Sequence, residues 1–450
     1  MAKRQNLCSG ICLYMCSQTA VNTDGEPTVN RQSRLTSKEG HRRNMSLNII
    51  IEKAKRFIQR MKRRFVNAWL LLIEKRHYYT SLQSYVFEYP EMAEILSIRT
   101  SRLVYAMGKE EDNIEYAGQL ILKKARIKNA TCFVFSDIIK LNDGRCLYEM
   151  KELELLQPYV NFKDEIILHD TAKWCKLKRC RESIHIPRAI KIGGMFGFNY
   201  FHFMYQILPR MLETSDIDPS VPLLLDYSVR DISSLHDLVI WCNQEKRDVI
   251  YMEYDIAYNI GELYIISSPS FIIPNLKTSL PPHIISCSYS DDSIRQLSKR
   301  LIHYADAKMN VAKRIFICRN KAGRRRQYNE QELFDTVSPY GFKSIFPEEL
   351  SMAEQISAFY NADIIVAPSG AALTNLLFIK PGALVIIFYN LPPTRETLWE
   401  SIIKILGGRV ITLYDTKGTN RLKYQRNFYI NPITLKETIK HLEITENNEK

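Results

Sequence analysis

From residue 189 onward, the chain alternates short apolar runs with segments whose apolar residues recur every three or four positions. The runs predict buried strands, and the three-to-four periodicity predicts amphipathic helices. The expected strands are 189–192, 221–225, 248–252, 314–318, 343–346, 363–367, 383–389 and 410–414. The expected helices are 200–212, 232–242, 292–305, 329–337, 351–360, 371–379, 395–406 and 435–442. Repeated βα units of this length predict an α/β fold with a mostly parallel sheet covered on both faces.

The region before this alternation has a different pattern of apolar residues. Residues 85–190 contain apolar runs such as 131–135 and 165–168, which predict short strands and turns. Four prolines punctuate residues 268–282, a composition typical of a linker. We therefore expect two Rossmann-like lobes, 85–275 and 283–450, that face a cleft. Open α/β sheets bind ligands at the carboxyl ends of their strands, so the cleft is the expected ligand site.

The N-terminal residues predict an extension rather than a third lobe. Residues 1–44 are polar and aperiodic, which predicts a disordered arm, and Met45 is an alternative start. Residues 45–80 predict a basic amphipathic helix, since apolar residues recur at helical steps opposite a face of Lys and Arg. Two interpretations are open: residues 45–76 bind an anionic membrane surface, or the helix packs on its own domain.

The positive charge of the chain is concentrated in the same extension. Residues 1–64 hold 14 Lys and Arg against 4 Asp and Glu, which gives +10 of the net charge of +13. The folded body is close to neutral, which argues against a nucleic-acid partner. No apolar run reaches the roughly 18 residues that span a bilayer, and residues 1–20 lack the apolar core of a secretory signal. We expect a cytoplasmic protein, peripheral on the inner face of the membrane.

The cysteines predict neither a disulfide scaffold nor a metal centre. There are only ten in 450 residues. Cys8, Cys12 and Cys16 repeat every four residues, but no fourth ligand lies near them in the sequence. We expect reduced, unpaired thiols and no metal.

The sharpest local feature is the turn that follows the strand 363–367. The apolar run ends in Pro368-Ser369-Gly370, and a helix of small residues begins at once. Gly370 and Ala371 allow a ligand to approach the backbone closely. A helix start presents unpaired N–H groups and the positive end of a dipole, and the Ser369 hydroxyl can cap the helix or bond a ligand oxygen. This turn is a candidate phosphate site, although many α/β proteins have such a turn without a ligand.

Basic residues follow the strand 314–318. Arg319 ends the strand, and Arg324, Arg325 and Arg326 lie in the loop after it. In a parallel sheet these residues reach the same edge as Ser369. Arginine binds diphosphates bidentately and neutralises the charge that develops on a leaving group. The alternative is a solvated basic turn.

A third feature is the glycine-rich turn after the strand 189–192. Asn199 and His202 lie one helical turn apart just beyond it, among aromatic residues, and Arg210 closes the same helix. Histidine is a natural general base near neutral pH, and Arg210 is placed to address an acceptor. Alternatively, His202 is a satisfied core residue and Arg210 is solvated.

The remaining candidate site residues lie at the starts of two predicted helices. Ser351 and Glu354 match a capping box, so we interpret Glu354 as structural. Glu330 and Gln355 each sit at the start of a helix that should border the cleft.

Together these features resemble glycosyltransferase family 61, which includes bacterial capsular polysaccharide enzymes and eukaryotic xylosyl- and N-acetylglucosaminyl-transferases. The resemblance covers roughly residues 185–390 and is most specific over 314–378, where it adds Asn329 and Asn375 to the donor-binding candidates. A weaker match over 199–210 carries Asn199, His202 and Arg210. The chain departs from the family pattern at two positions. Many relatives have His where this chain has Ser369, and Glu where this chain has Ile387.

The resemblance implies a GT-B fold, in which 85–275 is the acceptor-side lobe and 283–450 binds the nucleotide-sugar. It implies an inverting glycosyltransferase that needs no metal or other cofactor, with His202 and Asn199 as catalytic residues. The partners expected are a nucleotide-sugar donor and a glycan or lipid-linked glycan acceptor, in capsular or other cell-surface polysaccharide synthesis. The alternatives are a pyruvyl-type transferase, a non-catalytic scaffold of a polysaccharide assembly complex, and a nucleic-acid binder that uses residues 1–64.

Overall fold

The computed structural model describes residues 55, 57–58, 61, 72–106, 114–152, 156–162, 164–273, 275–278, 287–306, 309, 312–319, 327–390, 398–415 and 427–448. The chain comprises two compact units, Met1–Trp69 and Leu70–Lys450. In the first unit the described residues are helical, and Phe57, Ile58 and Met61 are exposed. The predicted arm at 1–44 lies outside the described residues. Among those that are described, no helix has the length and apolarity needed to cross a bilayer.

The helix predicted over 45–80 does not reach residue 80. Residues Arg76–Thr80 form strand β1, which pairs with β5 (Cys146–Leu147) and β7 (Trp174–Leu177). The helical spacing of apolar residues stops near Leu72, and Tyr78 and Tyr79 then favour an extended backbone. The basic helical segment therefore ends before Arg76.

One mixed sheet of 13 strands occupies residues 76–290. Its main path runs β10 (Val249–Met252), β9 (Leu223–Asp226), β8 (Glu182–Lys191), β11 (Ile256–Ile266), β3 (Ile114–Cys132), β4 (Ile139–Lys140), β5, β1, β7 and β6 (Ile167–Asp170). Three further strands, β2 (Ala93–Ala106), β12 (Ser270–Ile272) and β13 (Cys287–Ser290), extend from β3. The helices beside it are α2 (Leu82–Glu88), η1 (Glu149–Glu152), α4 (Ser228–Asp231), α5 (Ser233–Cys242), α6 (Asp291–Leu301) and η5 (Ile302–Tyr304).

Two sequence expectations fail in this sheet. The short strands expected over 85–190 include two long ones, β2 and β3, of 14 and 19 residues. Their antiparallel pairing is interrupted by two register shifts, not by turns, so turn signals do not mark it. The predicted linker at 268–282 contains strand β12, because Pro269 and Pro274 flank Ser270–Ile272 and leave its backbone free to pair with β13.

The second sheet has five parallel strands in the order β15 (Lys343–Ile345), β14 (Arg314–Ile317), β16 (Ile364–Pro368), β17 (Leu384–Tyr389) and β18 (Arg409–Tyr414). The expectation of a parallel βα sheet is confirmed here. By chain order the strands run 2-1-3-4-5, a doubly wound arrangement whose switch point lies between its first and third strands. Those strands are β14 and β16.

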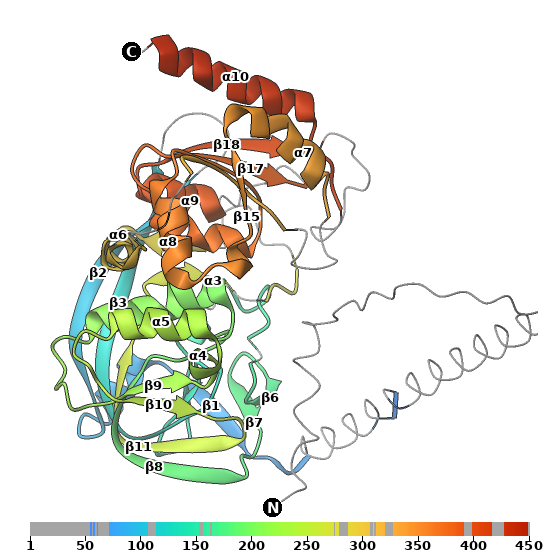
Figure 1. Ribbon diagram of the computed structural model, residues 1–450. Coiled ribbons are helices and arrows are strands. Elements are labelled where there is room, and N and C mark those ends of the chain that lie inside the picture. Colours follow the sequence, from blue (N-terminus) through green and yellow to red (C-terminus); the bar gives the residue numbers. More distant parts are fainter. Residues whose placement is uncertain are drawn as a thin grey trace, which may run out of the picture. The chain divides into compact units, whose positions relative to one another are not determined.

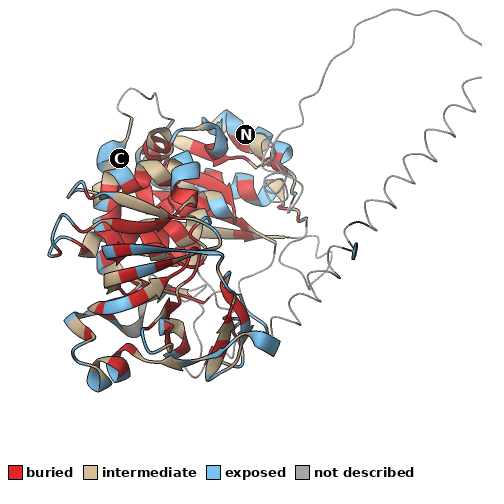
Figure 2. Cartoon of the chain, turned by 90° about the horizontal axis from the view of Figure 1, so that it is seen from below, coloured by how far each residue is buried: buried red, intermediate tan, exposed pale blue. Residues whose placement is uncertain are grey.

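Helices cover both faces of this sheet (Figure 1). One face packs against α7 (Glu330–Val337) and α10 (Pro432–Asn448). The other packs against α8 (Met352–Asn361), the 3-10 helix η8 (Ala371–Phe378) and α9 (Leu398–Ile405). Short 3-10 turns η6 (Ser338–Tyr340) and η7 (Pro347–Glu349) flank β15. The buried residues concentrate along the strands and the helices packed on them (Figure 2).

The helix expected over 200–212 changes its winding twice. It is α-helical over Tyr200–His202 (α3), a π-helix over Phe203–Ile207 (η3) and 3-10 over Leu208–Glu213 (η4). Pro209 has no N–H to donate to the preceding turn, and the Leu208 N–H instead bonds the Phe203 carbonyl. Residues of η3, α8, η8 and α9 share one buried core, so this segment packs directly on the parallel sheet's helices.

Candidate functional site at the switch point

The carboxyl ends of β14 and β16 place Arg319 against the turn that follows β16, here called the Ser369 loop (residues 368–372). Arg319 Nη1 donates to the Ser369 carbonyl at 3.3 Å. A Cβ at Gly370 would lie 3.4 Å from the Arg319 guanidinium carbon, so the cation covers this glycine. Neighbouring strands of a parallel sheet end at the same edge, which explains why residues 50 positions apart meet there.

The backbone of the Ser369 loop is open. Among the described residues, the N–H groups of Gly370, Ala371 and Ala372 have no hydrogen-bond partner. Ala371 is exposed. Unpaired N–H groups next to a guanidinium make this edge of the sheet electropositive, a suitable environment for an anion.

Ser369 does not cap the helix, contrary to one sequence expectation. Its N–H bonds the Phe388 carbonyl at 2.8 Å, and its hydroxyl accepts from Trp399 Nε1 at 3.3 Å. The N-cap is Gly370, in an extended backbone, and the helix is 3-10 rather than α. Ser369 therefore lies one residue before the cap position, and its hydroxyl bonds the indole of Trp399 on α9.

Glu330 and Asn329 hold the loop after β14 rather than facing outward. Glu330 is buried and accepts the Arg319 N–H at 2.7 Å. Asn329 donates to the Ile430 carbonyl at 2.9 Å and accepts the Ile430 N–H at 3.1 Å. Glu330 therefore positions the backbone of Arg319, and Asn329 positions the chain before α10. The predicted Arg324 and Arg325 lie outside the described residues.

Asn375 and Gln355 are engaged within the protein as well. Asn375 is 1% exposed, accepts from the Tyr200 hydroxyl at 2.5 Å and donates to Gln355 Oε1 at 2.8 Å. Gln355 donates in turn to the Leu350 carbonyl at 3.1 Å. Asn375 thus joins η8 to α3 and, through Gln355, to α8, so the structure does not favour the expected contact of either residue with a donor.

The predicted base, His202, lies in the same neighbourhood. Phe201, the residue before it, meets Trp399 edge-to-face at 5.5 Å, and Trp399 bonds Ser369. His202 stacks on Phe196 with ring centroids 4.8 Å apart and bonds Gln206 through Nδ1 at 2.5 Å. Burial lowers the pKa of His202 below its ordinary value of 6.5, so the imidazole is neutral at neutral pH. The structure thus packs the histidine segment against α9 and η8, the helices beside the Ser369 loop.

Asn199 has a structural task. Its side-chain oxygen accepts the N–H groups of Phe201 at 3.0 Å and His202 at 3.4 Å, so it caps α3. This bond fixes the backbone of His202. The geometry favours a positioning role over direct catalysis.

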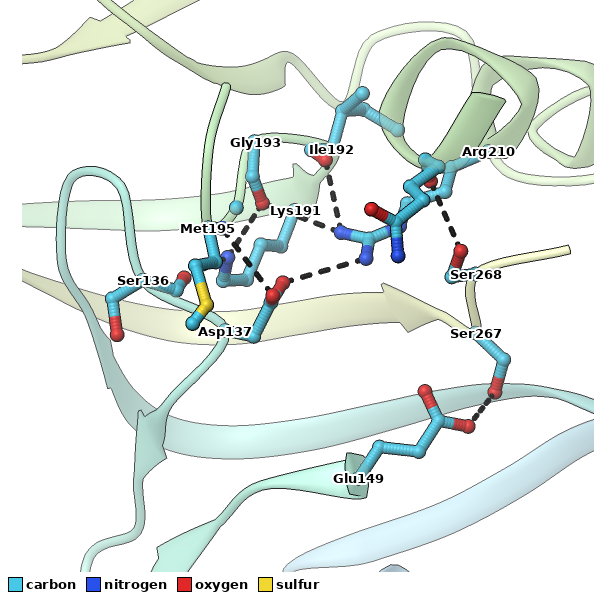
Figure 3. Close-up of polar contacts among 12 residues, drawn as sticks. Ser136, Asp137, Glu149, Lys191, Ile192, Gly193, Met195, Arg210, Ser267 and Ser268 are labelled. Carbon is cyan, nitrogen blue, oxygen red and sulfur yellow. Dashed lines mark hydrogen bonds and ion pairs between the residues drawn. The ribbon is translucent and has the colours of Figure 1, made fainter. Parts of the chain in front are cut away.

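Arg210 is buried, contrary to the expected contact with an acceptor. It is 9% exposed and donates to the Ile192 carbonyl at 3.1 Å and to Asp137 at 3.4 Å (Figure 3). Nearby, Lys191 donates to the carbonyls of Ser136 and Gly193 at 2.8 and 2.6 Å. Figure 3 shows both cations pointing toward the turn after β8, and both side chains are buried.

That turn, residues 193–197, is built around carboxylates that the sequence analysis missed. Asp226 accepts the N–H groups of Phe135 at 2.7 Å and Gly194 at 2.9 Å. Asp137 accepts the Met195 N–H at 3.3 Å. A Cβ at Gly194 or Gly197 would fall within 2.4 Å of one of these carboxylates, so the glycines are needed for the close approach.

A signal for these residues was present in the sequence. Lys191 stands inside the apolar run Ala189–Ile192, and Asp226 directly follows the buried Leu223–Leu225 run. A charge at the end of a buried strand needs a partner, and each has one here. Asp137 lies in a turn, where a carboxylate is ordinary, and nothing local distinguishes it.

In the described part of the chain, no three His, Cys, Asp or Glu side chains are arranged to hold a metal ion.

Comparison with known proteins identifies one related family. The family model of Glycosyltransferase 61 matches residues 200–386, a range that runs from α3 through β17 and contains both His202 and the Ser369 loop. The chain matches no curated protein. Membership of this family implies glycosyltransferase activity, with a sugar donor and a glycan acceptor. The match supports the assignment of residues 200–386 to glycosyltransferase family 61.

Proposed function

We propose that the protein is an inverting glycosyltransferase that moves a sugar from a nucleoside diphosphate to a hydroxyl of a glycan. The observation that carries the proposal is the position of Arg319 and the open amides of the Ser369 loop at the switch point, with the His202 segment packed beside them on η8 and α9. An anion-binding edge and a neutral base on adjacent segments are what this reaction requires.

The reaction assigns one task to each side of the site. Nε2 of His202 takes the proton from the acceptor hydroxyl, whose oxygen attacks the anomeric carbon and forms the new glycosidic bond. The bond between that carbon and the diphosphate oxygen breaks, and its electron pair leaves with the nucleoside diphosphate. Attack from the face opposite the leaving group inverts the configuration. Arg319 and the N–H groups of Gly370 and Ala371 stabilise the charge on the departing diphosphate.

The wider setting belongs to the same proposal. The mixed sheet of residues 76–290 and the parallel sheet of residues 314–414 belong to the two lobes of a GT-B enzyme, and the second lobe binds the nucleotide. The acceptor is a growing, lipid-linked glycan of a capsular or other cell-surface polysaccharide, met at the cytoplasmic face of the membrane. The basic helix before Arg76 holds the enzyme there, and the reaction needs no metal.

A panel of nucleotides tests the first requirement. The full chain is heated with UDP, GDP or CMP, and the melting temperature is recorded. One of the nucleoside diphosphates should stabilise the folded state, by about 2.7 kcal/mol at a concentration of 100 Kd. A scaffold without a donor site would show no shift with any nucleotide. Stabilisation without release of a nucleoside diphosphate during turnover would favour a pyruvyl-type transfer.

A further inference from the structure

His202 and Gln206 lie four residues apart on the segment that changes from α3 to the π-helix η3. Their side chains meet, with His202 Nδ1 2.5 Å from Gln206 Oε1. π-helical turns occur frequently at functional sites, and here the wider turn begins directly after the histidine.

The orientation of the Gln206 amide is set by a second bond. Its Nε2 donates to the Ile272 carbonyl, on strand β12, at 3.4 Å. A carbonyl can only accept, so the nitrogen of the amide must face Ile272 and the oxygen must face the histidine. An amide oxygen also only accepts, and therefore His202 Nδ1 carries the hydrogen.

The other ring nitrogen is then the basic one. In a neutral imidazole with a proton on Nδ1, the lone pair is on Nε2. Within the described residues, His202 Nε2 has no hydrogen-bond partner. Phe196 stacks on the ring and fixes its plane, and Phe196 is itself held by a backbone bond from Asn199 N to its carbonyl at 2.8 Å.

We propose that Gln206 is a positioning residue that selects the Nδ1–H tautomer of His202 and so makes Nε2 the proton acceptor. This inference rests on the proposed function for its chemical consequence. Gln206 acts only through the histidine: it removes the tautomer in which Nε2 already carries a proton and cannot take another.

One ionised group acts on His202 across space. The Asp137 carboxylate favours the protonated imidazole, whereas burial disfavours it and has the larger effect. In the described structure, no other charged group of the turn 193–199, η3, β12 or η8 shifts the pKa of this histidine. Asp137 therefore stabilises the imidazolium that forms during transfer, and Gln206 continues to accept from its Nδ1–H.

The tautomer is measured without any substrate. Nitrogen NMR of the full chain distinguishes a protonated from an unprotonated ring nitrogen, and His202→Ala identifies the signals of this residue. We expect the proton on Nδ1 in the wild type and a mixture of tautomers in Gln206→Met, which keeps the size of the side chain but lacks the acceptor. A proton on Nε2 in the wild type would overturn the proposal.

Kinetics test the consequence. The rate of diphosphate release from UDP-N-acetylglucosamine or GDP-mannose, as the nucleotide panel selects, should fall about tenfold or more in Gln206→Met, with KM unchanged. Gln206→Glu should restore most of kcat. Its carboxylate raises the pKa of His202, so the acidic limb of the kcat profile moves to higher pH. The control is Gln244→Met, which changes an exposed glutamine beyond α5.

These experiments distinguish the positioning role of Gln206 from the proposed role of His202 as the base. An unchanged kcat in Gln206→Met, in protein that melts at the wild-type temperature, would contradict the positioning role. A wild-type rate in His202→Ala instead removes His202 as the base, whatever tautomer the NMR shows.

Discussion

Two glycine-containing turns follow buried strands in this molecule, and the protein uses them in opposite ways. In the turn 193–197 after β8, the N–H groups of Gly194 and Met195 bond the protein's own carboxylates, Asp226 and Asp137. In the Ser369 loop after β16, three successive N–H groups have no partner among the described residues, and the charged group that faces them is Arg319.

This difference shows what makes such a turn a ligand site. In the sequence, both turns contain small residues and precede a helix, so each could be predicted to bind phosphate on that basis alone. In the first, an internal carboxylate occupies the position that an external anion would need. In the second, a guanidinium adds to the positive potential of the amides. The charge that the fold places opposite the turn decides its use.

The largest effect is expected from removing that guanidinium. Arg319→Gln should weaken binding of the nucleoside diphosphate about 10- to 100-fold, since a hydrogen bond to a charged group contributes about 1.5–3 kcal/mol. Titration calorimetry with the nucleotide that the thermal panel selects measures it. Arg295→Gln is the matched control, because Arg295 is an exposed residue of α6 paired with Asp291. Equal affinities in the two variants would mean that the Ser369 loop is not the anion site.

Two glycine substitutions test the comparison between the turns through the free energy of unfolding. In Gly197→Ala the new Cβ would lie 2.4 Å from Asp226 Oδ2, which the Gly194 N–H holds in place, so the folded state should lose about 1–3 kcal/mol. Gly370→Ala meets only Arg319 at 3.4 Å, in an extended backbone, and should change stability by less than about 0.5 kcal/mol. Urea unfolding measures both. Similar losses in the two variants would contradict the distinction between a filled turn and an open one.

The last prediction concerns pH. Burial raises the pKa of Asp226 from 3.8 to about 6, so the folded state disfavours the ionised form. Its contribution to the free energy of unfolding is then complete below about pH 4 and is lost as the pH rises through 6. The stability of the wild type relative to Asp226→Asn should therefore decrease between pH 4 and 6. A difference that stays constant or increases over this range would show that the carboxylate is not held as described.

The parallel sheet could be predicted from sequence because its central strands are continuous apolar runs. β16 and β17, for example, are buried on both faces and read as Ile364-Ile365-Val366 and Leu384–Phe388. The meeting of Arg319 with Ser369 followed from the same pattern, since parallel neighbours share an edge. The mixed sheet could not be derived this way. β1 pairs in parallel with β5, about 70 residues away, and nothing in the sequence of such short strands identifies their partner.

For the site, the sequence distinguished residue types but not their orientation. Asn375 and Gln355 were expected to face a donor, yet they bond each other, because Tyr200 from another part of the chain turns toward them. Arg210 was expected at an acceptor and lies beneath the turn 193–197. Polar residues in an apolar helix satisfy one another before they satisfy a ligand, and only the tertiary packing shows which partner they find.

The hydrogen bond between Tyr200 and Asn375 restricts how the enzyme can move. It joins the helix that carries His202 to the helix that follows the Ser369 loop, and a second bond from the Tyr205 hydroxyl to the Thr374 carbonyl at 2.8 Å lies beside it. Separating the two segments would leave a buried amide and a buried carbonyl without partners, at a cost of roughly 1–3 kcal/mol each. The segment that carries His202 and the helix after the Ser369 loop should therefore move together. In the proposed reaction, closure around substrates would then bring other parts of the chain toward this pair.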